Sequence, residues 1–385
     1  MSLVLVYTGV ALRFLNKLIF TFLLFVAAAS AAEDEWQGVS RIIAVGDIHG
    51  DYASYLQVLR DAELVNRRGN WIAEDTHFVQ VGDLPDRGPD TDRIIAHMRK
   101  LEEQAEDDGG KVHALIGNHE AMNMLGDLRY VHPGEYEAFR SRNSRRLRNN
   151  LYDYHIEQLK LSVPEFVEEE GYRDEFDEAY PLGYVEHRLA WDKEGEIGAW
   201  VVTHNTIVKV NRTLFMHGGL SPQVLGMSLR EINDQVRSEL SGAIPETGRL
   251  TEAEEGPLWY RGLAANEEAL EQLHVDAVLD FYDVDHIVVG HTPGLGTVVP
   301  RFGGKVLVID TGISDYYGAH LASLRIDEDG LTTIQQGQAI SIPIGEESVL
   351  EYFKSIAAIE TEVSALTSLI ERIENPPPVQ APVEN

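Results

Sequence analysis

The sequence contains no cysteine among its 385 residues. This absence excludes disulfide bonds, thiolate ligands for metals and every mechanism that depends on a cysteine nucleophile. Basic residues are also scarce, because 32 Lys and Arg stand against 63 Asp and Glu and give a formal net charge of −31. Binding nucleic acid requires clustered Lys and Arg, so the composition predicts no nucleic-acid partner for the surface as a whole.

A marked apolar run lies near the N-terminus, from Leu18 to Ala29. Arg13 and Lys17 precede it, and small residues follow it up to residue 32. This order of features predicts a signal peptide over residues 1–32 and export, to a bacterial periplasm. The run is shorter than the ~20 residues that a membrane-spanning helix needs. The alternative is an uncleaved N-terminus that anchors the protein in the inner membrane.

Five short apolar runs have the composition of strands, and each ends at a polar cluster rich in glycine. Between several of them, apolar residues recur at helical spacing, as in Ile94, Ile95, Met98 and Leu101. Alternating strands and helices predict a layered α/β core with functional residues at the carboxyl ends of the strands. The runs cover residues 42–45, 78–81, 114–116, 214–216 and 287–289.

Two segments break this alternation within and after a predicted main domain at residues 33–345. Residues 121–195 carry no clear strand pattern, which predicts a mostly helical insertion. Apolar residues in 346–375 alternate spacings of three and four, which predicts a C-terminal amphipathic helix. This helix either lies on its own domain or forms a homodimer through a coiled coil. The Pro-rich tail at 376–385 is predicted to be disordered.

The polar clusters that end the five runs hold residue types that bind metals. Asp47 and His49 suit one Mn, Fe or Zn ion, and Asp83 can bridge to a second ion. Three further ligands complete the second site, namely Asn118, His217 and His291. Two divalent ions and two carboxylates leave a net charge of about +2, which attracts a phosphate dianion and lowers the pKa of a bridging water. The resulting hydroxide is expected to attack phosphorus directly.

Three neighbours of these ligands complete the predicted chemistry. Arg87 can grip phosphate oxygens with its planar guanidinium. His119 is not needed as a ligand, so we expect it to act as a general acid on the leaving oxygen, with Asp86 orienting it. A lone Asp-x-His is more often a turn than a metal site. Five such clusters in compatible order favour a phosphate ester hydrolase.

The motifs GDIHG at 46–50, GDLPDRG at 82–88, GNHE at 117–120 and HGG at 217–219 resemble the phosphoprotein phosphatase branch of the calcineurin-like metallophosphoesterase superfamily. GPLWYR at 256–261 and VVGHT at 288–292 resemble the Shewanella-like protein phosphatases. The resemblance covers residues 40–330. It implies a central β-sandwich flanked by helices, the four-layer architecture of the metallophosphatases.

The resemblance also implies roles for individual residues. The metal ligands and His119 with Asp86 keep the roles given above, and Arg87, Arg261 and Asn118 hold the phosphate. Arg261 and the preference for phosphotyrosine rest on the resemblance alone. Pro85 stands where relatives carry another residue, and we expect it to stiffen the turn without disturbing the ligands.

Two other hypotheses remain at this point. The same pair of divalent metals could serve a dinucleoside polyphosphate, a nucleotide or another small phosphoester in place of a phosphorylated protein. A catalytically silent binding module that uses the C-terminal stripe is a different class, and the intact ligand set disfavours it.

Overall fold

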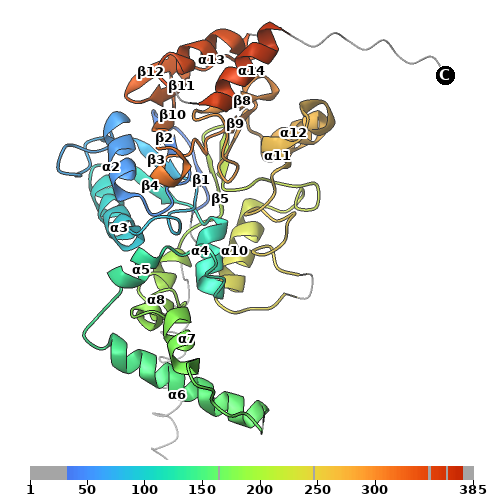
Figure 1. The fold of residues 1–385 in the computed structure, drawn as a ribbon. Coiled ribbons are helices and arrows are strands. Elements are labelled where there is room, and N and C mark those ends of the chain that lie inside the picture. Colours follow the sequence, from blue (N-terminus) through green and yellow to red (C-terminus); the bar gives the residue numbers. More distant parts are fainter. Residues whose placement is uncertain (1–32, 164, 246–247, 346–347, 361–362, 376–385) are drawn as a thin grey trace, which may run out of the picture. The chain divides into compact units, whose positions relative to one another are not determined.

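Two six-stranded β-sheets stand at the centre of the fold (Figure 1). The structure is a computed structural model that describes residues 33–385 except 164, 246–247, 346–347, 361–362 and 376–385. The predicted signal peptide and the predicted disordered tail therefore lie outside the described residues. Within the described part, no helix is both long and apolar enough to cross a membrane.

Each of the two sheets combines parallel and antiparallel strand pairs. In the first sheet, β6, β7 and β9 run parallel, and its strand order is β1 (Glu35–Trp36), β5 (Ile207–Val210), β6 (Thr213–Met216), β7 (His286–Val289), β9 (Val306–Val308) and β8 (Val299–Arg301). In the second sheet, β2, β3 and β4 run parallel, and its order is β12 (Gln338–Ser341), β11 (Gly330–Gln335), β10 (Ala322–Asp327), β2 (Ile42–Val45), β3 (His77–Gln80) and β4 (Lys111–Ala114).

Residues along one strand point alternately to two different cores. Ile42 and Ala44 pack with Phe215 and Val288 of the other sheet, while Ile43 packs among side chains of the helices. Both faces of each central strand are thus buried, which explains why the sequence shows continuous apolar runs there instead of alternation. The predicted β-sandwich flanked by helices is confirmed.

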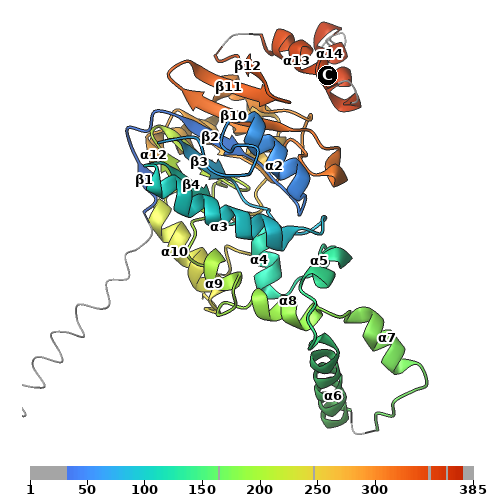
Figure 2. The same cartoon turned by 90° about the vertical axis from the view of Figure 1, so that its left-hand side faces the viewer.

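Helices cover the outer faces of both sheets (Figures 1 and 2). On the second sheet these are α2 (Tyr52–Asp61) and α3 (Thr91–Asp107), and on the first sheet α10 (Leu229–Leu240), α11 (Gly262–Ala265) and α12 (Glu268–Tyr282). The capping box of Ser228 and Glu231 begins α10. Two short 3-10 turns, η1 (Phe302–Gly304) and η2 (Asp315–Tyr317), interrupt the loops around β8 to β10.

The segment at 121–195 is helical, and its described residues form no strand. It begins inside α4 (Asn118–Leu125) and continues through α5 (Pro133–Ala138), α6 (Ser144–Ser162), α7 (Tyr172–Ala179) and α8 (Tyr184–Ala190). The short α9 (Gly198–Val201) leads the chain back to the sheets. The predicted helical insertion is thus confirmed as to its secondary structure.

The prediction of a single C-terminal helix is wrong, because two helices form there, α13 (Val349–Ala357) and α14 (Ser364–Glu374). Between them, Glu360 is buried and accepts hydrogen bonds from Gln335 and Gln336, at 2.8 and 2.6 Å, and from His320 at 3.0 Å. These contacts draw the chain toward the sheet and override the local helical periodicity. The apolar stripe packs largely on its own domain through Tyr352, Phe353, Ile356 and Leu366. The homodimer stays an untested prediction.

Candidate active site

The predicted site residues follow the carboxyl ends of parallel strands. Asp47 comes after β2, Asp83 after β3 and Asn118 after β4, while His217 and His291 come after β6 and β7. Because the two sheets face each other, these ends meet in one place. Close packing requires glycine there, since a Cβ on Gly117 would stand 2.3 Å from Asp83 Oδ1.

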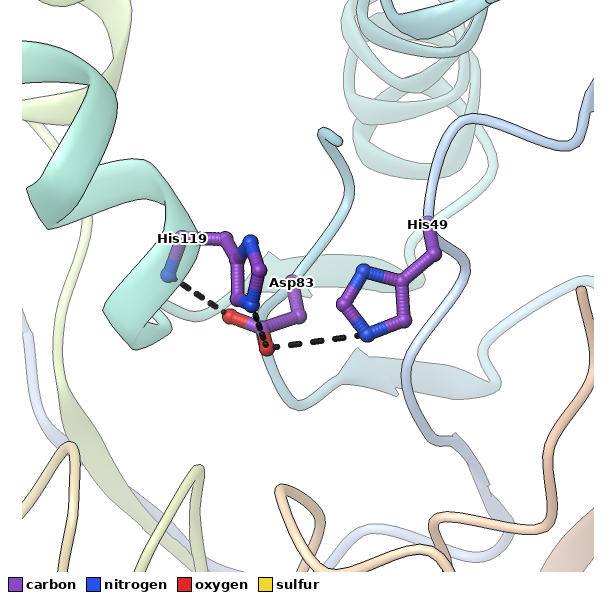
Figure 3. Close-up of side chains that lie close together, drawn as sticks. All are labelled: His49, Asp83 and His119. Atoms are coloured by element: carbon purple, nitrogen blue, oxygen red, sulfur yellow. Dashed lines mark hydrogen bonds and ion pairs between the residues drawn. The ribbon is translucent and has the colours of Figure 1, made fainter. Parts of the chain in front are cut away.

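The carboxylate of Asp83 lies at the centre of the cluster and is 1% exposed. Its Oδ2 lies 3.2 Å from His217 Nε2, 3.8 Å from His119 Nε2 and 3.9 Å from His49 Nε2. Figure 3 shows the imidazoles of His49 and His119 on either side of this carboxylate. One carboxylate therefore faces imidazole nitrogens from three different strand ends.

Backbone carbonyl groups fix the orientation of two imidazole rings. His217 Nδ1 donates to the Val81 carbonyl at 2.9 Å, and His49 Nδ1 donates to the Pro85 carbonyl at 3.2 Å. In the neutral rings this leaves the Nε2 lone pairs facing Asp83, as metal ligands require. Pro85 thus leaves the ligands in place and orients one of them through its carbonyl group.

The atoms around His217 Nε2 are mostly electron-pair donors. Asn118 Oδ1 lies 2.8 Å away and His291 Nδ1 lies 3.1 Å away, in addition to the Asp83 oxygen. Within the described part of the chain, the buried His291 Nε2 has no hydrogen-bond partner. Converging lone pairs repel one another unless a positive charge lies among them. The residues therefore fit a divalent cation, and His49 Nε2 and Asp47 Oδ2, which are 3.8 Å apart, fit a second one beside Asp83.

His119 has a carboxylate partner instead of a carbonyl. Its Nδ1 donates to Asp86 Oδ2, and Asn123 Nδ2 donates to the other Asp86 oxygen at 3.0 Å. Burial alone would lower the pKa of His119, but the carboxylates of Asp83 and Asp86 outweigh burial and raise that pKa. His119 can therefore carry a proton on Nε2, the ring nitrogen that faces Asp83.

The two arginines predicted to hold phosphate contact different parts of the cluster. The Arg87 guanidinium lies over the ring of Tyr130, 3.9 Å from its centroid, and Tyr130 in turn packs against His119. Arg261 donates through Nη1 to the His291 carbonyl and to Thr292 Oγ1. All the residues predicted for the site are thus brought to one region.

The structure adds residues that the sequence did not single out. Asp310 follows β9, is 3% exposed and interacts electrostatically with both Asp47 and Asp83. Glu120 was quoted within a motif but given no role, and it accepts hydrogen bonds from the amides of Asp83, Leu84 and Gly117. Asp310 could have been found, because the run at 306–309 ends in Asp-Thr-Gly as the other strands end in polar clusters.

A cleft of about 620 Å³ opens beside Arg261. Trp259 lines it, and the ring of this residue lies 5.7 Å from that of His291, measured between centroids. Arg129 from the insertion and Glu254 and Glu255 from the opposite loop also line it. The cleft thus lies between Arg261 and the first residues of the insertion.

Two layered sheets between helices, with Asp, Asn and His side chains that could bind metals at their strand ends, are typical of a metallophosphatase. The chain belongs to the calcineurin-like phosphoesterase family, whose pattern it matches over residues 40–295. It is therefore a hydrolase of phosphate esters, from a family that uses divalent metals.

Several known proteins are similar to this chain. An uncharacterized protein of Schizosaccharomyces pombe is 36% identical, covering 76% of this chain and 79% of the relative. The Shewanella-like protein phosphatase 1 of Plasmodium berghei is 28% identical over 78% of this chain and 75% of the relative. Among solved structures, the cold-active protein-tyrosine phosphatase of a psychrophilic Shewanella species is 29% identical with a TM-score of 0.61, covering 80% of this chain and 82% of that one.

Proposed function

We propose that the protein is a phosphoprotein phosphatase that binds two divalent metal ions and favours phosphotyrosine. The observation that carries the proposal is the Asp83 carboxylate, which faces ligand nitrogens on two sides. Asp47, His49 and Asp83 would hold one ion, and Asp83, Asn118, His217 and His291 the other. When bound, the two ions supply Lewis-acid charge and lower the pKa of a water molecule toward neutrality.

The protein's own groups position the phosphate and move the proton. Arg87 and Arg261 hold two sides of the phosphate with charged hydrogen bonds, and the Asn118 side chain assists them. His119 donates the proton on Nε2 to the leaving oxygen as its bond to phosphorus breaks. Asp86 keeps the ring oriented through Nδ1 and stabilises its positive charge before the transfer.

Aromatic side chains around the cluster support a preference for an aryl phosphate. Tyr130 packs against His119 and Tyr317 packs against His49, each with ring centroids 5.2 Å apart. Tyr316 lies beside Arg87, and Trp259 lies beside His291. The phenyl ring of a phosphotyrosine whose phosphate reaches Arg87 would contact these aromatic side chains. An aromatic pair contributes about 0.5–1.5 kcal/mol to binding in addition to the contribution from burying apolar surface. The tyrosine phosphatase activity named for the Shewanella relative agrees with this preference.

The test is a panel of substrates on metal-stripped protein before and after addition of Mn. We expect no turnover without metal, and after Mn addition a higher kcat/KM for a phosphotyrosine peptide than for the matching phosphoserine peptide. ATP and a dinucleoside polyphosphate form the third arm. Faster hydrolysis of either nucleotide than of both peptides would favour the small-molecule alternative. Full activity in the stripped protein would contradict the role of the metals.

A further inference from the structure

Two adjacent residues of the second motif have left-handed backbones. Asp86 has φ of 71° and Arg87 has φ of 65°, and neither is glycine. Such a conformation is strained for a residue other than glycine and persists only where the surroundings enforce it. These two residues are also the partner of the general acid and a ligand of the phosphate. The surroundings of this turn therefore bear on both functions.

The helical insertion supplies the acceptors for both amides of the turn. Asp86 N donates to Glu135 Oε1 at 2.9 Å, and Arg87 N donates to the Tyr130 carbonyl at 3.1 Å. Asn123, on α4, holds the Asp86 side chain. The turn that carries His119's partner is thus fastened by residues that lie in the segment 121–195.

Glu135 is a fully buried carboxyl group at the centre of this arrangement. It is 0% exposed, and its other oxygen lies 3.6 Å from the Nε2 of His187, which is equally buried and lies on α8. Burial, followed by repulsion from Asp86, raises the pKa of Glu135 to about 8. Burial, followed by the charge of Arg188, lowers the pKa of His187 to about 3. An uncharged Glu135 keeps a carbonyl oxygen, which still accepts the Asp86 amide.

We propose that Glu135 is a positioning residue for catalysis, which holds the turn of Asp86 and Arg87 so that His119 delivers its proton and Arg87 meets the phosphate. The helical insertion thereby controls the acid step. This inference rests on the proposed function, since it assumes that His119 protonates a leaving oxygen.

The physical reason is the alignment that proton transfer requires. Without the Glu135 oxygen, the Asp86 amide is left buried and unpaired, and the turn relaxes toward negative φ to find another partner. Asp86 then moves relative to His119 Nδ1. A displacement of about 1 Å at a catalytic group can cost 100-fold in rate. Asp47 and His217 form no hydrogen bond with Glu135, but the peptide unit that carries the Asp86 amide also carries the Pro85 carbonyl that orients His49. Metal content is therefore measured beside the rates.

The experiment compares Glu135→Ala with Glu135→Gln on an alkyl and an aryl phosphomonoester. We expect E135A to lower kcat for the alkyl ester about 100-fold and for the aryl ester less than about tenfold, because a poor leaving group depends more on the acid. E135Q keeps the acceptor oxygen and should retain both rates. The ratio of the two rates is measured on one preparation, so a partly unfolded sample does not change it.

Glu186→Ala is the matched control, since Glu186 lies in the same insertion and accepts from Ser141 and Ser144 without contacting the turn. It should leave the ratio unchanged. A second readout needs no activity, namely amide hydrogen exchange of the peptide that contains Asp86 and Arg87. It should accelerate in E135A and not in E135Q or E186A.

Two outcomes would overturn the inference. One is an equal loss on both esters in E135A with metal content at the wild-type level, and the other is unchanged exchange at the turn. Wild-type protein that hydrolyses neither ester would instead contradict the proposed function. In that case the exchange experiment still reports whether Glu135 holds the turn.

Discussion

His119 and His49 flank Asp83 at nearly equal distances, yet the partners of their Nδ1 atoms separate their roles. His49 donates to a backbone carbonyl and His119 to the carboxylate of Asp86. Burial lowers the pKa of His49 to about 3, so its ring is neutral and suited to bind a metal. The carboxylates of Asp83 and Asp86 raise the pKa of His119 in spite of burial, which favours the protonated ring. This difference supports the roles proposed for them, with His49 as a metal ligand and His119 as the acid.

His119→Asn tests the acid role directly. Asn cannot deliver a proton, so we expect kcat for an alkyl phosphate to fall about 100-fold or more. An aryl phosphate should lose less, because a phenol with a pKa of about 10 leaves without full protonation. Steady-state assays on both esters measure the difference. The control is His155→Asn, because His155 lies on α6 and its ring is hydrogen-bonded to Tyr172. Equal losses on the two esters would remove His119 from the acid role.

At the scale of elements, the strands and several helices could be predicted, and the tertiary contacts that modify them could not. The runs beginning at Ile42 and Ile287 became β2 and β7 with shifts of at most one residue. The run beginning at Ala114 was placed late, since β4 spans Lys111–Ala114 and includes Lys111 and His113, polar residues that did not fit an apolar pattern. A pattern of apolar residues indicates which positions are buried, so it does not reveal the part of a strand that consists of polar residues.

The site was predictable to a similar extent. The predicted metal ligands could be found because each directly follows an apolar run that the sequence shows. The arrangement of the strands in the two sheets then brings Asp83 and His217 together. Glu135 does not follow an apolar run, and it lies in a helix with a second acidic residue. Its role as a hydrogen-bond acceptor depends on the contact between α5 and the turn of Asp86, which the sequence does not show. The break between α13 and α14 had the same cause, since Glu360 responds to partners far away in sequence.

Glu360→Gln tests whether this buried carboxylate anchors the C-terminal helices. Burial alone would raise the pKa of Glu360. The hydrogen bonds from His320, Gln335 and Gln336 more than offset burial, so the pKa of Glu360 is lowered overall. A carboxyl group with a lowered folded pKa stabilises the fold above its unfolded pKa of about 4.5 and loses that contribution as the pH falls further. E360Q should therefore cost about 1.5–3 kcal/mol at pH 7 and show a flatter decline below pH 4.5.

Thermal unfolding from pH 7 down to pH 3.5 measures both parts of this prediction. Glu351→Gln is the control, because Glu351 is largely exposed and its ion pair with Lys354 should contribute little. A pH profile of E360Q that parallels the wild type would show that the carboxylate does not provide the anchor.

At the scale of the whole molecule, a chain with a strongly negative net charge must attract an anion to its site. The formal net charge of −31 repels a phosphate dianion at long range, while the proposed phosphate ligands Arg87 and Arg261 and the proposed cations would attract it only at short range. Salt screens the long-range part first, since the Debye length falls from about 30 Å at 0.01 M to about 8 Å at 0.15 M. Contacts inside the buried site are screened much less. The two contributions can therefore be separated by ionic strength.

We expect kcat/KM for a phosphotyrosine peptide flanked by Glu to rise as salt increases from about 0.01 to 0.15 M, because screening relieves the repulsion. A peptide with the same phosphotyrosine flanked by Lys should show the opposite trend, since the acidic surface attracts it at low salt. The two peptides share one reacting group, so chemistry at the site cancels from the comparison. The measurement is kcat/KM at saturating metal across the salt series. If both peptides lost efficiency in parallel, the charge near the site would dominate the encounter, and the acidity of the surface would serve solubility without influencing the choice of substrate.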